Sequence, residues 1–506
     1  MEKLISIRNI CIQNMKFIFL LFLLLWPLSA HAIDFKIRGV WDFGLELGQG
    51  GDLITKYNGQ HRTGMYGNSP GGDNFNALQR LRTWLFFRVS ENLLGVLMFK
   101  IPERDPMTWG YAEKGGALGA DGNQIQVSSA ALDWQVPKSK LRFRMGLQYI
   151  TFPAFTGQNV HIANTAMAVT ANYHANNHFS ITGMWMRPFN DNWSSADGDA
   201  FTANYLDNID IFGLFLPITL DGIKLTPWAA GGMVGRNARA GTYHYTNMFW
   251  DKDLSNVPYN RGRPVNPNWR RDLHRLDSYG SLFMAGFTGE ITRIEPFRFA
   301  WDFQYAGIKS GYGRYDRGGF VAALLAEYKT AWGIPGIFGW YASGEDDDAS
   351  NGSERMFVMS PLNFSGRNDF SALAFYGAQN QSVRQGILAN TYVGTWGIGA
   401  RIKNFSLLDD LKQTLRFLYI NGSNQKESLE RYNRFATHVP ANGDYLLTHH
   451  EHAWELSLSS EYTIYENLKL YSELGYLGLS RQRYSARERE AKCDAWNFSL
   501  ALTYEF

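Results

Sequence analysis

In the last eleven residues of the chain, a large apolar side chain stands at every second position. The apolar positions are Trp496, Phe498, Leu500, Leu502, Tyr504 and Phe506. A period of two residues is typical of a β-strand with one apolar face and one wet face. Aromatic residues stand at both ends of the apolar face. Such a strand must lay that face against a protein core or against a lipid bilayer.

The same two-faced pattern recurs along the chain. In residues 35–47, 80–89, 141–149, 297–305 and 454–462, apolar side chains alternate with polar ones. The polar set is often charged, and a packed sandwich core would need a partner for each of these charges. The sequence therefore predicts strands whose outer side faces lipid and whose inner side is wet.

The connections between these strands alternate in length. Short turns, such as residues 90–92 and 465–467, alternate with long polar stretches, such as 235–279 and 344–388. This alternation is typical of transmembrane barrels, which have short periplasmic turns and longer external loops. We predict an all-β fold, a transmembrane antiparallel β-barrel of about eighteen strands. Sixteen is the alternative count, because residues 468–479 do not alternate cleanly.

The N-terminus resembles a secretory signal. Lys16 precedes the apolar run 17–26, and residues 29–32 offer a small-x-small cleavage pattern, so residues 1–32 are predicted to be a signal peptide. Met15 is an alternative start. Residues 33–506 contain 46 basic and 46 acidic residues, which gives no argument for a nucleic-acid partner. After residue 32, no apolar stretch is long enough for a spanning helix.

Several short segments carry a resemblance to a known family. They read E-N-L-L-G-V-L-M-F (91–99), G-G-A-L-G-A-D-G (115–122), A-L-D-W-Q-V-P (131–137), R-M-G-L-Q (144–148), W-Y-A-S-G (340–344) and N-G-S-E-R-M (351–356). With these segments the chain resembles the homotrimeric outer-membrane porins of sulfate-reducing proteobacteria and their relatives. The final strand is similar to the closing strand of such barrels, whose last aromatic residue, here Phe506, is read by the barrel-assembly machinery.

The resemblance implies a function and a location. It implies a homotrimer in a Gram-negative outer membrane, in contact with lipid and lipopolysaccharide. Each barrel would pass small hydrophilic solutes and ions by passive diffusion, without enzyme activity or cofactor. The alternatives are a substrate-specific, sugar-type channel, an outer-membrane barrel enzyme and an adhesin. Trp84 and Phe86, predicted to face inward, are a short version of the aromatic track that a sugar channel needs.

General porins narrow their pore with the third external loop, which in this chain is residues 149–165. The loop has no carboxylate, and its apolar content favours burial inside the lumen or at a subunit contact. We expect residues 33–506 to form one barrel domain with this loop folded inward. The candidate constriction residues are Phe152, Pro153, Phe155, Gln158, Asn159 and His161.

The inward positions of the first strands are predominantly basic. The candidate pore-lining residues are Arg38, Arg80, Arg82, Arg88, Lys100, Arg142 and Arg144. Walls of Arg and Lys set pore selectivity toward anions. The alternative is that inward carboxylates such as Asp42, Glu46 and Asp133 neutralise them in place. Acidic residues 345–348 depart from the pattern of a calcium loop, and the histidines near residue 450 are interpreted as solvated rim residues, so no metal site is predicted. Divalent-cation binding at the acidic outer loop is the alternative.

Overall fold

The fold is described from a computed structural model. It describes residues 33–49, 56–57, 60–61, 74–101, 125–157, 159, 162–190, 208–234, 280–309, 316–348, 354–356, 370–375, 388, 392–406, 408–427, 447–480 and 494–506. The predicted signal segment, residues 1–32, lies outside this range. The described part of the chain contains no helix that is long and apolar enough to cross a membrane.

The strands of the first half begin directly after the predicted signal segment. They are β1 (Asp34–Gln49), β2 (Lys56–Tyr57), β3 (Gln60–His61), β4 (Asn74–Ser90), β5 (Leu93–Ile101), β6 (Gln126–Gln135), β7 (Leu141–Thr151), β8 (Ala163–His174), β9 (Ser180–Asn190), β10 (Asn208–Phe215), β11 (Ile218–Leu220) and β12 (Ile223–Val234). β2 and β3 pair only with each other among the described strands. β10 and β11 both pair with β12 and together fill one position of the main sheet.

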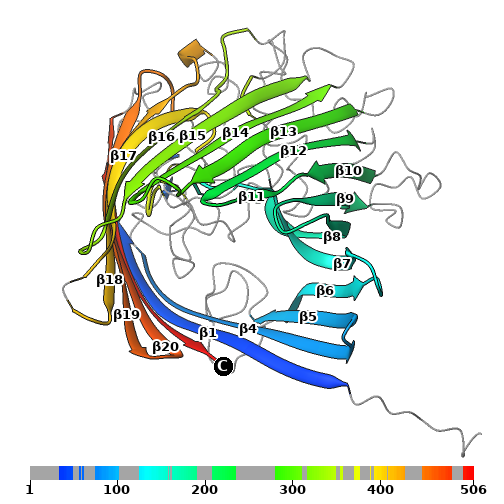
Figure 1. The fold of residues 1–506 in the computed structure, drawn as a ribbon. Helices are drawn as coiled ribbons and strands as arrows, with labels where there is room; N and C mark the ends of the chain where they lie inside the picture. The colour runs from blue at the N-terminus through cyan, green and yellow to red at the C-terminus, as the bar shows by residue number, and fades with distance from the viewer. Residues whose placement is uncertain are drawn as a thin grey trace, which may run out of the picture.

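The strands of the second half complete the sheet. They are β13 (Gly280–Ile291), β14 (Phe297–Lys309), β15 (Arg317–Tyr328), β16 (Ile334–Ala342), β17 (Thr395–Phe405), β18 (Leu411–Gly422), β19 (His452–Tyr465), β20 (Leu468–Ser480) and β21 (Asp494–Glu505). Neighbouring strands are antiparallel, and β1 pairs with both β4 and β21 (Figure 1). The result is a closed barrel of 18 strands. Closure leaves the main sheet without an unpaired edge.

The predicted connection pattern is confirmed. Glu91 and Asn92 alone join β4 to β5, and Glu466 and Asn467 alone join β19 to β20. The weakly alternating residues Leu468–Ser480 form a complete strand that pairs with both of its neighbours, so the alternative count of sixteen is wrong. An even number of strands places both ends of the barrel on the side of the short turns, which is the periplasmic side of such barrels.

Exposure separates the two faces of each strand. In β1, Phe43 is 44 % exposed and its neighbour Asp42 is 2 % exposed. Exposed aromatic residues gather at both ends of the outer face. Those near the long connections include Tyr149, Tyr305, Tyr341, Trp396, Trp454, Tyr476 and Trp496, and those near the short turns include Trp134, Tyr173, Phe297, Tyr328, Tyr462 and Tyr504. Two aromatic girdles around an apolar band are typical of a barrel that spans a membrane.

The chain closes the barrel at Gly39 and Phe506. The backbone N–H of Gly39 donates to the carbonyl oxygen of Phe506 at 2.7 Å, and the N–H of Phe506 donates to the carbonyl oxygen of Gly39 at 3.0 Å. The Phe506 ring lies over Gly39, where a Cβ atom would come within 2.0 Å of it. Only glycine leaves room for the ring at this position.

We expect Phe506→Ala to lower the yield of closed barrel, because the ring that covers Gly39 at the seam is lost. Refolding of the purified chain into detergent, read by the mobility shift between heated and unheated samples, measures the closed fraction. Phe506→Tyr keeps a ring at this site and is the matched control. An equal closed fraction for the alanine and tyrosine variants would show that the ring does not contribute to closure.

Candidate functional site: the lumen

The candidate pore-lining cations share the inner face of the first strands. Cross-strand partners stand on the same side of a sheet. Arg80 pairs with the buried Asp42 and Arg82 with Val40, so these arginines point inward with Asp42. The strand register places the remaining cations on the same inner face. The pairs are Arg38 with Trp84, Arg88 with Asp34, Arg82 with Lys100, Asp133 with Arg144 and Gln135 with Arg142. Their role in a pore stays a prediction.

We call the inward cations of β1, β4, β5 and β7 the basic wall. Two carboxylates, Asp42 and Asp133, form ion pairs with part of it. Asp42 accepts from Arg80 at 3.1 Å and from Arg82 at 3.0 Å, and Thr503 also donates to it at 2.9 Å. Arg80 and Arg82 therefore share the carboxylate of Asp42. One carboxylate therefore faces two guanidinium groups at this position.

A second carboxylate does the same further around the wall. Asp133 accepts from Arg142 at 3.1 Å and lies 3.8 Å from the Nε of Arg144. The arginine side chains are 51 % and 39 % exposed, whereas that of Asp133 is 7 % exposed. The positive groups therefore face the lumen while the carboxylate stays behind them.

The opposite wall carries a chain of ion pairs from β12 to β17, with residues on five of these six strands. Lys224 and Arg298 bind Glu290 at 2.8 and 2.9 Å, and Arg298 and Arg401 bind Glu327 at 2.8 Å each. The alternating pattern predicted an inward Arg298, but not its partners, because strand register is needed to find them.

The first inner loop, residues 152–162, reaches from β7 to the inner face of β14. The backbone N–H groups of Phe155 and Thr156 each donate to the Asp302 carboxylate at 2.8 Å, and the Thr156 hydroxyl also donates to it. Asn159 donates to Gln304 at 3.1 Å, and Arg298 donates to the Phe155 carbonyl at 2.9 Å. The loop has no carboxylate of its own, and the carboxylate at this contact is Asp302 of the wall.

Of the candidate constriction residues, Phe152, Pro153, Phe155 and Asn159 are described. Gln158 and His161 lie outside the described residues. Phe152 is buried, with its ring centroid 5.1 Å from that of Phe215 and 4.8 Å from that of Trp228. The constriction role of these residues stays a prediction.

The expectation of a polar inner face is wrong in the sector around Phe152. The inner face from β8 to β14 carries a buried apolar cluster that packs with the first inner loop. Its members include Ala168, Met184, Met186, Ile211, Phe215, Trp228, Ala230, Met284 and Ile308. These residues are buried by the loop rather than wetted by the lumen, which alternation alone could not reveal.

A second inner segment comes from the connection between β16 and β17. It comprises residues 354–356, 370–375, 388 and 392–393, and sequence reasoning missed it. The fully buried carboxylate of Glu455 on β19 accepts from the Ser371 hydroxyl at 2.6 Å and from the backbone N–H groups of Ala372, Leu373 and Ala374 at 2.7, 3.2 and 2.8 Å. Successive backbone N–H groups around one anion form a nest.

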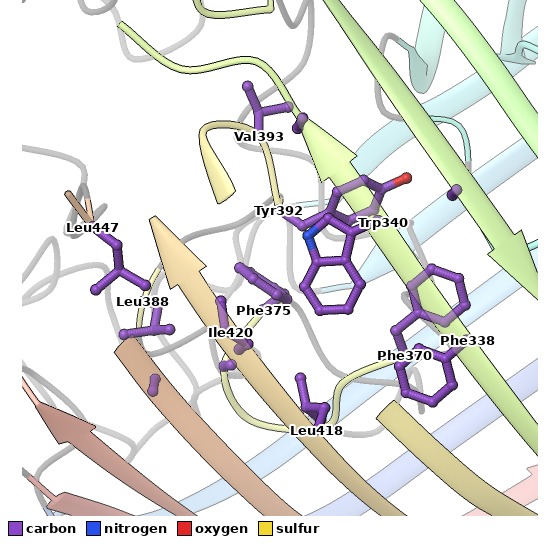
Figure 2. Close-up of a cluster of buried hydrophobic side chains, with 14 of the residues drawn as sticks. Phe338, Trp340, Phe370, Phe375, Leu388, Tyr392, Val393, Leu418, Ile420 and Leu447 are labelled. Atoms are coloured by element: carbon purple, nitrogen blue, oxygen red, sulfur yellow. The ribbon is translucent and has the colours of Figure 1, made fainter. Parts of the chain in front are cut away.

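Aromatic packing holds the second inner segment against the wall (Figure 2). The ring centroid of Phe370 lies 4.5 Å from that of Phe338 and 5.7 Å from that of Trp340. Phe155 of the first inner loop packs against the same cluster of wall and inner-segment residues. Burial raises the pKa of the Tyr392 hydroxyl in this cluster, which keeps it neutral. The run F-S-A-L-A-F at 370–375 was the missed signal, because it is too apolar for a solvated loop.

Glu354, in the same connection, has a different electrostatic environment. Burial, and then repulsion by Asp346 and Glu345, raises the pKa of its carboxyl above the usual value.

Among the described residues, no group of three or more His, Cys, Asp or Glu side chains is arranged to hold a metal ion.

In the described part of the chain, the exposure of the inner face differs between the two sides of the barrel. Inner-face residues of β13 to β21 are predominantly buried. Inner-face residues in the turn-side half of β4 to β9 are partly exposed, and they include Arg82, Trp84, Phe86, Arg88, Met98, Lys100, Arg142, Arg144, Thr170 and Asn172. The exposed lumen surface in the described part of the chain therefore lies along the basic wall.

Comparison with known proteins supports the fold. No family model matches the chain, and no curated protein matches it. Among solved structures, OccK9 (OpdG) of Pseudomonas aeruginosa matches with a TM-score of 0.51 and 10 % identity over 94 % of this chain and 98 % of that chain. OpdK of the same organism matches with a TM-score of 0.51 and 8 % identity over the same shares. OmpT of Vibrio cholerae, in its trimer form, matches with a TM-score of 0.35 and 10 % identity over 93 % and 99 %.

Proposed function

We propose that the chain is an outer-membrane channel for passive diffusion of small hydrophilic solutes, with a preference for anions. The observation that carries this proposal is the exposed basic wall inside a closed barrel. Small anions that enter the lumen meet guanidinium and ammonium groups, while the carboxylates Asp42 and Asp133 are held behind arginines. Walls of this kind favour anions over cations.

The remaining parts of the proposal concern assembly and location. Residues 1–32 direct export and are removed, and Phe506 is read by the barrel-assembly machinery. The apolar band between the two aromatic girdles contacts lipid and lipopolysaccharide. Three barrels associate as a homotrimer, each with its own lumen. The aromatic girdles support the membrane location, and the contact between Phe506 and Gly39 supports a contribution of Phe506 to closure.

A substrate-specific channel is the second candidate function. Trp84 and Phe86 lie side by side on the inner face of β4 and are partly exposed. Aromatic side chains in a lumen offer a contact for part of a solute, which a general diffusion channel does not need. The same observation favours this candidate over an enzyme or an adhesin.

The anion preference is tested by the reversal potential of the channel in a KCl gradient. We expect a reversal potential on the chloride side, and a shift toward the potassium side in the variant Arg142→Gln/Arg144→Gln. This variant removes two lumen charges and uncovers the Asp133 carboxylate. The matched control is Lys309→Gln/Lys329→Gln, which removes two charges at strand ends away from the basic wall. An unchanged potential in the arginine variant would contradict the proposed role of the wall.

A further inference from the structure

The inner faces of β1, β4 and β5 form a regular grid at the periplasmic end of the lumen. Register places Lys36, Phe86 and Val96 in one row. The next row contains Arg38, Trp84 and Met98, which stand two residues further along each strand. The grid has no register shift over these two rows, so all six side chains share the inner face. Four of them are apolar and form a square.

Cations frame this apolar square on three sides. On β1 the frame is Lys36 and Arg38, both exposed. Arg88 borders the square toward the turn, in the row of Asp34 and Leu94. Arg82 and Lys100 border it toward the membrane centre, in the row of Val40.

Few carboxylates face the square. Asp34 lies 3.7 Å from Lys36, and both side chains are exposed by half or more, so this pair is weak. On the fourth side β6 places Ala131 beside Val96 and Ser129 beside Met98, and Asp133 lies one row toward the turn, where it accepts from Arg142. Along the β1 and turn-side edges of the square, the exposed cations Lys36, Arg38 and Arg88 therefore outnumber the carboxylate Asp34.

The square and its frame have the dimensions of a small amphiphile. Neighbouring strands lie about 4.8 Å apart, and alternate residues of a strand lie about 6.6 Å apart. Trp84, Phe86 and Met98 are partly exposed, whereas Val96 is 8 % exposed and lies beneath them as the floor position. The spacing of the three exposed side chains suits contact with one six-membered ring or a short alkyl chain. The surrounding frame lies one position further out, which is within reach of a charged group on that ring.

We propose that this square is a binding subsite for amphiphilic organic anions, with Trp84, Phe86 and Met98 holding the apolar body and Lys36, Arg38 and Arg88 holding the anionic group. The subsite rests on the proposed channel function and refines its substrate class. It differs from a sugar track, because a sugar needs acceptors and donors for hydroxyl groups beside the aromatic rings. Here the polar neighbours are cations.

The subsite is tested with cyclohexanecarboxylate added to the periplasmic side of single channels in planar bilayers. Acetate is the anion without an apolar body, cyclohexylmethanol is the neutral analogue, and maltotriose represents the sugars. We expect cyclohexanecarboxylate to interrupt the current at a concentration about tenfold lower than acetate or cyclohexylmethanol, as burial of part of a ring predicts. Equal potency of the three small compounds, or interruption by maltotriose alone, would overturn the subsite.

Adjacent phenylalanines on opposite faces supply a matched pair of variants. Phe86→Ala is expected to remove most of the tenfold advantage, whereas Phe87→Ala, on the lipid-facing side, is expected to keep it. Lys36→Gln/Arg38→Gln is expected to weaken interruption by the carboxylate and leave the neutral analogue unchanged. The same loss in Phe86→Ala and Phe87→Ala would contradict the subsite.

Failure of the subsite and failure of the channel are distinguishable. Conductance in KCl alone reads the channel function in the same recordings. Saturation-transfer NMR of cyclohexanecarboxylate with the barrel in nanodiscs reads binding without any need for conduction. Normal conductance without a difference among the probes overturns only the subsite, whereas binding in nanodiscs without conductance overturns only the channel.

Discussion

Replacing Glu455 with glutamine is expected to release the second inner segment and to increase the single-channel conductance. The carboxylate accepts four hydrogen bonds from Ser371, Ala372, Leu373 and Ala374 in a site closed to water. An amide has a single acceptor oxygen and brings two N–H donors toward three backbone N–H groups. Leaving these groups unsatisfied costs roughly 2–4 kcal/mol in total, so the segment should leave the wall for part of the time.

The matched control for this variant is Glu461→Gln. Glu461 lies on the same face of the same strand, six residues toward the turn, and binds Lys469 at 2.9 Å. Both variants remove one inner carboxylate, so a change in lumen charge affects both. Larger and noisier conductance in Glu455→Gln alone would support the anchor. Identical conductance in the two variants would show that the nest does not hold the segment in place.

Replacing Asp302 with asparagine is expected to loosen the first inner loop. The asparagine side chain can accept from only one of the two backbone N–H groups that Asp302 now binds, those of Phe155 and Thr156. The expected cost is roughly 1–3 kcal/mol, because a buried donor loses its partner. Phe152 remains in its aromatic contacts with Phe215 and Trp228, so we expect new subconductance states rather than full release.

Thr156→Val separates the hydroxyl from the backbone contribution at this anchor. It removes only the hydroxyl bond to Asp302 and keeps the two backbone bonds, so its expected effect on subconductance is small. Single-channel recordings of the two variants under the same voltage make the comparison. An effect in Thr156→Val as large as in Asp302→Asn would contradict an anchor that works through the backbone.

The architecture of the barrel could be predicted because alternation and loop length act locally. In β1, the alternation of Asp42 with Phe43 already separates the inner from the outer face, and the turn at residues 90–92 already separates two strands. Side chains that recur every second residue lie on one face of a strand, whatever the pairing register with the neighbouring strands. For this reason a count of about eighteen strands and the direction of the basic side chains required no knowledge of neighbouring strands. The alternative of sixteen is excluded only by the pairing of β20 with β19 and β21.

The interior could be predicted only in part, because it depends on contacts between residues far apart in sequence. Asp302 binds a loop nearly 150 residues earlier, and Glu455 binds a segment more than 80 residues earlier. Alternation marks such carboxylates as inward but does not show what they bind. Inward Met186 and Trp228 contradicted the expected polar face for the same reason, since their burial depends on the loop that covers them.

The central claim is that the closed barrel encloses a water-filled path along the basic wall, the inward cations of β1, β4, β5 and β7. The most direct measurement is the current through the purified, refolded chain in a planar bilayer under a KCl gradient. The claim predicts stable stepwise conductance with a reversal potential on the chloride side. A folded barrel that inserts and passes no current, or whose current reverses on the potassium side, would contradict it.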